Sequence, residues 1–501
     1  MSCFLTTFFL VLLSATANNV ACSTKHLEMV GIAREGLLRA MSWAQGLEIL
    51  NRPDGDSGFV NQALRDCVKL YKEAEQRLAR LVSGENGDYS HDDVVTWLSA
   101  ASASHTTCLD GLGEKGVLYE AQWAQNLTRV IREALAVYGD ENSQTRKRKG
   151  IGWFSHDTYN ITVTEGPGLN NEGGLLASWD ATTSGADFVV ARDGSGNYKT
   201  INDAVDALAR LGQNRSGRVV VYVKSGVYNE NVEIGGDLKN IMFVGDGIDE
   251  TIVTASKNVQ DGATTLNSAT FGVSGDGFWA RDITFDNTAG PEKHQAVALR
   301  VSSDLSIFYR CGFKGYQDTL FVHSLRQFYR ECQIYGTVDF IFGDASVILQ
   351  QCDIFVRRPM DHQSNMITAQ GRDDLNENTG ISIMNSRVMS SFEFHDVNGN
   401  FKSYLGRPWK KYSRTVFLKT DLDGLVDERG WKEWNGDFAL STLYYAEYMN
   451  TGVGASTSNR VQWPGFHVLS DPNEANKFTV RNFIGGADWI PATGVPFWAD
   501  L

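Results

Sequence analysis

The sequence lacks the markers of several common enzyme classes. No GxSxG nucleophile elbow occurs, so a Ser-His-Asp esterase has no marker here. HExxH and P-loop patterns are missing, and no Cys/His cluster has the spacing of a zinc site. We therefore expect neither a metal nor a cofactor.

Positive charge and long apolar runs are also scarce. Lys plus Arg number 46 against 60 acids, a net charge of −14, which argues against nucleic acid as the main partner. Beyond the first residues no stretch approaches the ~20 apolar residues of a membrane span, so no membrane association is expected. Sequons at Asn126, Asn160 and Asn214 fit secretion.

The apolar run at the start resembles a secretory signal peptide, residues 1–17. It ends in small residues, with Ala15-Thr16-Ala17 as the cleavage site, although no positive charge precedes it. A buried N-terminal helix is the alternative. With 501 residues the chain is long enough for at least two domains.

Residues 23–140 follow a helical pattern. One apolar face repeats at three- and four-residue steps through Ala63, Leu64, Cys67, Leu70, Tyr71, Ala74, Leu78 and Leu81. A second face runs through Val94, Trp97, Leu98, Ala101 and Cys108. Ser90 is placed to cap that second helix, with Asp93 three positions on. Because Cys67 and Cys108 both lie on apolar faces, we expect a disulfide between two packed helices.

Residues 141–185 break the helical pattern and are predicted to be a linker. They begin with the basic run Arg146–Lys149 and continue through a Gly- and Asn-rich stretch without periodicity. The basic run is either a site for a processing protease or a solvated charge cluster, and composition alone favours the cluster.

From residue 186 onward, short β-rich segments alternate with Gly, Asp and Asn, and they repeat. The segments IFYRCGF (307–313), FYRECQI (328–334) and ILQQCDI (348–354) place Cys311, Cys332 and Cys352 at steps of 21 and 20 residues. A β-rich repeat of that length predicts an all-β parallel β-helix whose coils stack ~4.8 Å apart. We expect a Cys332–Cys352 disulfide; burial of all three thiols as small apolar groups is the alternative.

Polar residues follow the same period. Gln295, Gln317 and Asp339 are spaced by 22 residues, and Asp318 precedes Asp339 by 21. Stacked coils would align these amides and carboxylates on one face, either as a functional groove or as a structural amide ladder. Gln317 and Asp318 can share a cleft only at a bend, for which Gly315 is suited.

Six segments of residues 186–501 resemble plant pectin methylesterases. They are, along the chain, GVYNE (226–230), FDNTAG (285–290), QAVALR (295–300), GYQDTL (315–320), GTVDFIFG (336–343) and LGRPW (405–409). The resemblance covers nearly all of this region in the right order. It implies a right-handed parallel β-helix that hydrolyses the C6 methyl ester of galacturonate.

The resemblance also assigns roles to single residues. It implies that Asp339 is the nucleophile and Asp318 the general acid/base, with Gln295 and Gln317 as the oxyanion hole. Arg407 is implied to position the substrate.

The same resemblance implies substrate contacts by Trp409, Thr288 and Gln295. Trp431 or Trp434 is a further candidate for an aromatic platform, although we expect Trp434 to pack in the core.

This residue set suits ester hydrolysis. Arg407, a fixed cation with a planar fork, can keep Asp339 ionised and aimed. Two side-chain amides can hold the oxyanion. The like charge of Asp339 is expected to raise the pKa of Asp318, which then protonates departing methoxide and later activates water.

The helical region resembles the invertase and pectin methylesterase inhibitor family. ALRDCVKLY (63–71), DVVTWLSAA (93–101) and TCLDG (107–111) carry the likeness, which departs at the start because only Cys22 is available for the family's N-terminal hairpin. Expected partners are therefore pectin, a proteinaceous pectin methylesterase inhibitor and a subtilisin-like processing protease.

We expect a secreted, monomeric enzyme of the cell wall that binds neutral, esterified pectin, given its own negative charge. A β-helix that binds pectin without turnover is the alternative. A glycoside hydrolase is a third interpretation of the acid pair.

Overall fold

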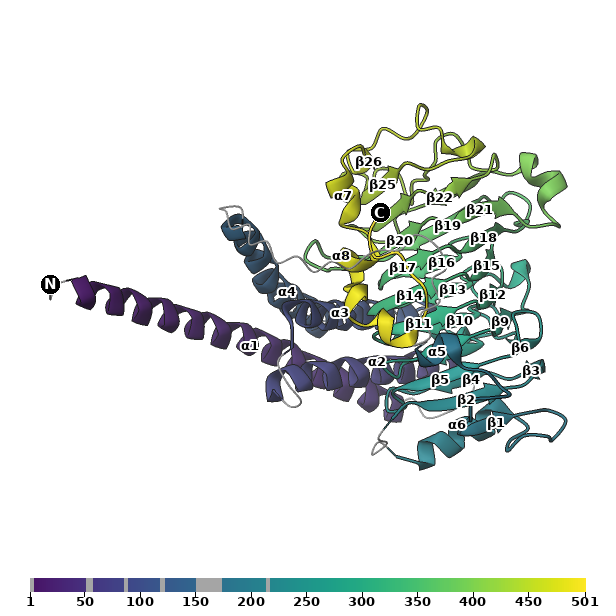
Figure 1. Ribbon diagram of the computed structural model, residues 1–501, viewed down its shortest axis with the longest axis horizontal. Helices are drawn as coiled ribbons and strands as arrows, with labels where there is room; N and C mark the ends of the chain where they lie inside the picture. The colour runs from purple at the N-terminus through teal and green to yellow at the C-terminus, as the bar shows by residue number, and fades with distance from the viewer. Residues whose placement is uncertain (1–3, 51–56, 85–88, 118–121, 150–173, 213–216) are drawn as a thin grey trace. The chain divides into compact units, whose positions relative to one another are not determined.

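The computed structural model describes residues 4–50, 57–84, 89–117, 122–149, 174–212 and 217–501 (Figure 1). The chain divides into two compact units, residues 1–162 and 163–501. Each unit is described by itself.

The described residues of the first unit form four helices: α1 (Phe4–Leu50), α2 (Ser57–Ser83), α3 (His91–Glu114) and α4 (Gln122–Lys149). The expected capping box begins α3, since the Ser90 hydroxyl accepts from the Asp93 amide and the Asp93 carboxylate accepts from the Ser90 amide. The predicted Cys67–Cys108 disulfide is confirmed and joins α2 to α3. No helix in the described ranges combines the length and apolarity of a membrane-crossing segment.

The outer helices of this unit extend across two predicted boundaries. α1 runs without interruption past residue 17, and α4 continues beyond residue 140 to Lys149. Residues 141–149 contain no glycine or proline, so nothing in that stretch terminates the helix before Gly150. The side chains of the basic run and residues 150–173 of the predicted linker lie outside the described part of the chain.

The second unit is a right-handed parallel β-helix, as predicted. Its strands form three parallel sheets, and successive coils supply one strand to each. In spatial order, the first sheet contains β1 (Phe188–Val190), β2 (Val219–Val223), β5 (Ile241–Val244), β8 (Trp279–Arg281), β11 (Ser306–Tyr309), β14 (Arg326–Arg330), β17 (Ser346–Gln350), β20 (Gly380–Met384), β23 (Arg414–Leu418), β25 (Tyr444–Tyr448) and β26 (Phe466–Val468).

The other two sheets complete the wall. The second contains β24 (Asp421–Leu422), β21 (Arg387–Ser390), β18 (Asp353–Val356), β15 (Gln333–Gly336), β12 (Gly312–Lys314), β9 (Thr284–Asn287), β6 (Thr251–Ala255) and β3 (Gly226–Asn229). The third contains β22 (Ser403–Gly406), β19 (Asn365–Gln370), β16 (Ile341–Gly343), β13 (Leu320–Val322), β10 (Leu299–Val301), β7 (Phe271–Val273) and β4 (Val232–Ile234).

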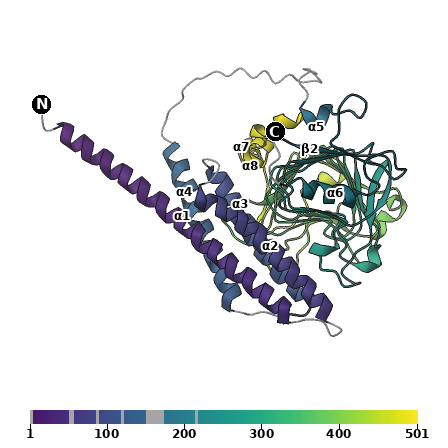
Figure 2. The same cartoon turned by 90° about the horizontal axis from the view of Figure 1, so that it is seen from below.

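Short helices complete the second unit. They are α5 (Leu175–Ser178), α6 (Ile201–Arg210), α7 (Pro472–Asn476) and α8 (Val480–Ile484). Ile201, Ala204 and Leu208 of α6 belong to the β-helix core, so α6 covers one end of the coil, as Figure 2 shows. Residues of α7 and α8 join a second apolar cluster on the outer face of the first sheet.

The predicted coil length holds only in the middle of the β-helix. Register pairs Leu299↔Leu320 and Leu320↔Ile341 are 21 residues apart, but Ile341 pairs with Thr368, 27 residues on. The additional residues form a loop between β18 and β19. Residues 363 and 364 of this loop line the groove described below.

Stacked side chains fill the interior. Phe308 stacks on Tyr329 at 4.9 Å between ring centres, and Phe285 on Phe313 at 5.9 Å. Parallel strands in register place like residues above one another, so each coil adds one layer to a continuous apolar core.

The expected Cys332–Cys352 disulfide is wrong. Cys311, Cys332 and Cys352 are buried free thiols, and the Cys332 thiol donates to the carbonyl of Phe308. Parallel side chains on adjacent coils keep their Cβ atoms near the strand spacing of ~4.8 Å, wider than the ~3.8 Å of a disulfide. The alternative interpretation, three small apolar groups in the core, is the one that the structure has.

Candidate active site

Asp339 and Arg407 form the most tightly defined contact among the predicted site residues. Arg407 Nε donates to Asp339 Oδ1 at 2.8 Å and Nη2 donates to Oδ2 at 2.6 Å. Asp339 lies in the short connection between β15 and β16, and Arg407 is the first residue after β22. The two residues are 68 positions apart in sequence, and only the stacking of coils brings them together.

Asp318 occupies the same position as Asp339, one coil earlier. In the strand pairs β12–β15 and β13–β16, which flank the two aspartates, paired residues are 21 positions apart in sequence. The Asp318 amide donates to the Val338 carbonyl at 3.1 Å. Both aspartates are buried, with 7% and 6% of their surface exposed. The two carboxylates therefore belong to adjacent coils of one face, at a strand spacing of ~4.8 Å.

The predicted bend lies at the aspartates themselves. Asp318 has φ 63° and Asp339 has φ 52°, both left-handed, where a non-glycine residue is uncommon. The left-handed residue reverses the alternation of side chains expected in a flat strand. Gln317 and Asp318 can consequently serve one groove, and the responsible residue is Asp318 rather than Gly315.

The two glutamines lie in neighbouring coils beside these acids. The Ala296 amide, directly after Gln295, donates to the Gln317 carbonyl at 3.2 Å. Within the described part of the chain, neither side-chain amide hydrogen bonds to another protein group, and both residues are half-buried. Their N–H groups therefore remain available to a bound molecule.

Of the predicted site residues, Gln317 and Arg407 line an open groove of about 380 Å³, whereas Asp318, Asp339 and Gln295 are not among its lining residues. The groove is lined by His294, Gln317, Val338, Gln363, Ser364, Met366, Arg407 and Lys432. Arg407 and Lys432 bring positive charge to an otherwise acidic protein. His294 and Lys432 were not predicted, since neither stands in a recognised segment.

Burial and Arg407 act on Asp339 in opposite directions. Burial raises the pKa of Asp339 above its ordinary value, and the two hydrogen bonds and positive charge of Arg407 work against that rise. For Arg407, burial lowers the pKa, but the contacts with Asp339 outweigh it and the pKa is raised. The guanidinium is thus a permanent cation whose fork fixes both carboxylate oxygens.

The tryptophans differ from expectation. Trp431 is fully buried, stacks on Tyr445 at 4.2 Å and donates to Glu447, so it offers no platform to a ligand. Trp434, expected in the core, is 37% exposed, and the Arg407 guanidinium lies 4.4 Å from its ring centre. The Asn435-Gly436 turn directly after Trp434 was the sequence signal for an exposed loop.

Neither Trp409 nor Thr288 is among the residues that line this groove. Trp409 is half-buried and packs edge-on against Phe342, with 6.1 Å between the ring centres. Its indole also contacts Gly371 so closely that a side chain at that position would place its Cβ 2.9 Å from the ring. Thr288 is exposed, and its hydroxyl donates to the Ala255 carbonyl at 3.1 Å. Across the described ranges, no group of three His, Cys, Asp or Glu side chains is arranged to hold a metal ion.

Comparison with known proteins gives two family matches. Residues 187–487 match the family model described as pectinesterase, and residues 12–137 match the model described as plant invertase/pectin methylesterase inhibitor. The chain is 55% identical to probable pectinesterase/pectinesterase inhibitor 36 of Arabidopsis thaliana, over 98% of this chain and 97% of that one. It is 51% identical to pectinesterase 2 of Citrus sinensis, over 88% and 82%. Among solved structures, the pectin methylesterase from carrot matches with 56% identity and a TM-score of 0.63, covering 64% of this chain and all of that one.

Proposed function

Because this chain belongs to the pectinesterase family, we propose that it hydrolyses the methyl esters of pectin with Asp339 as nucleophile and Asp318 as general acid/base. The fork between the buried Asp339 and Arg407, which lines a groove together with Gln317, is the observation that carries this assignment. A carboxylate is a weak nucleophile, and two short hydrogen bonds fix its orientation before the substrate arrives.

The reaction proceeds in two halves. An oxygen of Asp339 attacks the ester carbonyl, and the resulting oxyanion accepts hydrogen bonds from the amides of Gln295 and Gln317. As the C–O bond breaks, Asp318 gives its proton to the methoxide, and methanol leaves an acyl-enzyme anhydride. Asp318, now a carboxylate, takes a proton from water, whose oxygen attacks the anhydride and restores Asp339 and the galacturonate acid.

Methanol release from esterified pectin tests the assignment. Wild type should release methanol, and Asp339→Ala should not. Asp353→Ala is the matched control, because Asp353 accepts the same two-pronged contact from Arg387, at 2.7 and 2.8 Å, on another face of the β-helix. Full activity in Asp339→Ala would refute the nucleophile.

Two further measurements on the same pectin, binding affinity and new reducing ends, separate the alternatives when combined with methanol release. Affinity for pectin with no methanol at any pH would identify a β-helix that binds without turnover. New reducing ends without methanol would identify a glycoside hydrolase.

For the N-terminal region, we propose a signal peptide (1–17), an inhibitor-like pro-region (23–140), a linker (141–185) and a catalytic domain (186–501). A subtilisin-like protease cutting near Arg146–Lys149 would release a cell-wall enzyme of about residues 150–501. The match to an inhibitor model and the basic run support this proposal. N-terminal sequencing of the secreted protein tests it, and a mature start upstream of residue 60 would rule it out.

A further inference from the structure

Arg357 contacts both corners that carry the proposed catalytic aspartates, although it is not among the residues that line the groove of the candidate active site. It is the first residue after β18, and 22% of its side chain is exposed. Its main-chain amide donates to the Gly336 carbonyl at 2.8 Å, and its guanidinium donates to the Gly315 carbonyl at 3.0 Å. Gly336 stands three positions before Asp339, and Gly315 stands three positions before Asp318. One residue therefore holds the equivalent carbonyl of two successive corners.

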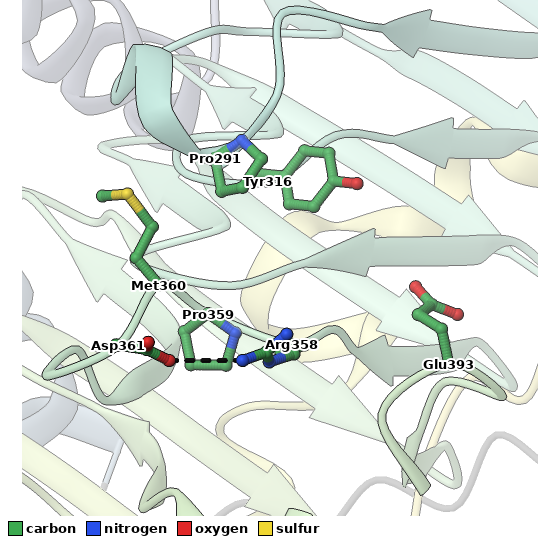
Figure 3. Close-up of a pocket in the computed structure, with 7 residues that line it drawn as sticks. All are labelled: Pro291, Tyr316, Arg358, Pro359, Met360, Asp361 and Glu393. Carbon is green, nitrogen blue, oxygen red and sulfur yellow. Dashed lines mark hydrogen bonds and ion pairs between the residues drawn. The ribbon is translucent and has the colours of Figure 1, made fainter. Parts of the chain in front are cut away.

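The guanidinium of Arg357 is fixed by an acceptor at each of its three nitrogens. Besides the Gly315 carbonyl, it donates to the Tyr316 hydroxyl at 2.8 Å and to Glu393 Oε1 at 2.9 Å. It also lies 3.9 Å from the Tyr316 ring centre. Figure 3 shows Tyr316 and Glu393 among the residues that line a neighbouring hollow. Because these contacts form without a ligand, the guanidinium is preorganised on the corner of Gly315.

Neutral main-chain groups hold the residues that follow in this corner. The Tyr316 carbonyl accepts from the Thr337 amide at 3.0 Å. The Gln317 carbonyl accepts from the Ala296 amide at 3.2 Å. A hydrogen bond from a cation is roughly twice as strong as one between neutral groups. The contact from Arg357 to the preceding carbonyl is therefore the strongest of these three restraints.

The corner needs such restraints because its backbone conformation is uncommon. Asp318 has φ 63°, and a non-glycine residue stays in this left-handed region only where the surrounding contacts enforce it. Gln317 and Asp318 are adjacent, so a shift of the corner moves the proposed oxyanion donor and the proposed acid together. A displacement of about 1 Å at reacting groups can cost about 100-fold in rate.

We propose that Arg357 is a positioning residue that holds the Gly315 carbonyl and thereby aims Gln317 and Asp318 at the ester attacked by Asp339. The inference rests on the proposed function. It assigns the effect of Arg357 to the chemical step, because the residues that it aims stabilise the oxyanion and protonate methoxide. A residue that only supported the surface of the protein would change KM or stability instead.

Methanol release by Arg357→Ala tests the inference, with kcat and KM fitted separately. We expect kcat to fall about 10- to 100-fold, because the corner loses its alignment, while KM stays within about twofold of wild type. Arg357→Met keeps the length of the side chain without a donor and should give the same fall in kcat. This second variant separates the lost hydrogen bonds from lost packing.

Chemical rescue provides a readout that general destabilisation would not move. Millimolar guanidinium chloride should raise kcat of Arg357→Ala about fivefold, because the free cation can enter the vacated site and donate to the Gly315 carbonyl. The reference is the same concentration of sodium chloride, which supplies the ionic strength without a donor. Wild type should show no increase.

Two further variants serve as controls. Arg387→Ala is the matched one, because Arg387 also makes two charged hydrogen bonds, to Asp353, and does not line the groove. Its kcat should stay within about twofold of wild type and should not rise with guanidinium. Tyr316→Phe removes only the hydroxyl acceptor and leaves the Gly315 contact, so kcat should fall no more than about threefold.

The two possible failures are distinguishable. A wild type that releases no methanol would overturn the proposed function and this inference with it. With an active wild type, the inference alone is overturned by an unchanged kcat in Arg357→Ala, by a loss confined to KM, or by an equal fall in Tyr316→Phe. Circular dichroism checks the folding of each variant, and Arg357→Met takes the place of Arg357→Ala in these comparisons if the alanine variant is unfolded.

Discussion

Replacing Arg407 by lysine isolates the contribution of the guanidinium fork. Arg407→Lys keeps the positive charge but can supply at most one of the two hydrogen bonds that now reach Oδ1 and Oδ2 of Asp339. A hydrogen bond to a charged group contributes roughly 1.5–3 kcal/mol, and Asp339 is too buried for water to replace the lost one. Taking about 2 kcal/mol, we expect kcat to fall about 30-fold.

The assay is initial-rate methanol release from highly esterified pectin, with kcat and KM fitted separately. Because the fork aims the nucleophile rather than the sugar, most of the loss should appear in kcat. Arg387→Lys is the control, since it breaks an equivalent fork with Asp353 outside the groove and should stay within twofold of wild type. If Arg407→Lys keeps more than half of the wild-type kcat, the fork does not orient the nucleophile.

Three further predictions follow from the same geometry. Gln317→Leu should lower kcat by ~10²–10³ because an oxyanion donor is lost, and an unchanged kcat would assign the oxyanion to other groups. Arg407→Gln should move the acid limb of the kcat/KM–pH profile upward, because Asp339 must be ionised to attack and the cation that opposes its raised pKa is gone; a downward shift would contradict this. Replacing Cys67 and Cys108 together by serine should lower the free energy of unfolding of the helical unit by about 4 kcal/mol, from a loop of 41 residues, as followed by circular dichroism in urea; a change below 1 kcal/mol would contradict it.

Local sequence features predicted much of the architecture. The helical period around Cys67 and Cys108 predicted two packed helices and their disulfide, because a helix face is a property of neighbouring residues. The 20- and 21-residue steps of the cysteines predicted the stacked coils, because each coil repeats the same strand and corner. The family segments added the family itself and the candidate site residues.

Other features arise only when the coils stack. The Asp339–Arg407 fork spans 68 positions and several loops of unequal length, so no local period could have given its geometry. Trp434 was expected in the core because aromatic residues usually pack there, and the loop that exposes it beside Arg407 is a tertiary feature.

The sequence by itself therefore predicted the repeat and the fold class, which the structure confirms, and proposed the acid and amide residues of the site. The tertiary structure decided that Asp318 and Asp339 sit at left-handed corners, that Cys332 and Cys352 stay reduced, and that Arg357 contacts both corners. The reason is physical. Strands and helix faces follow from short-range periodicity, whereas corners, thiol separations and grooves depend on how loops of different length settle on a shared core.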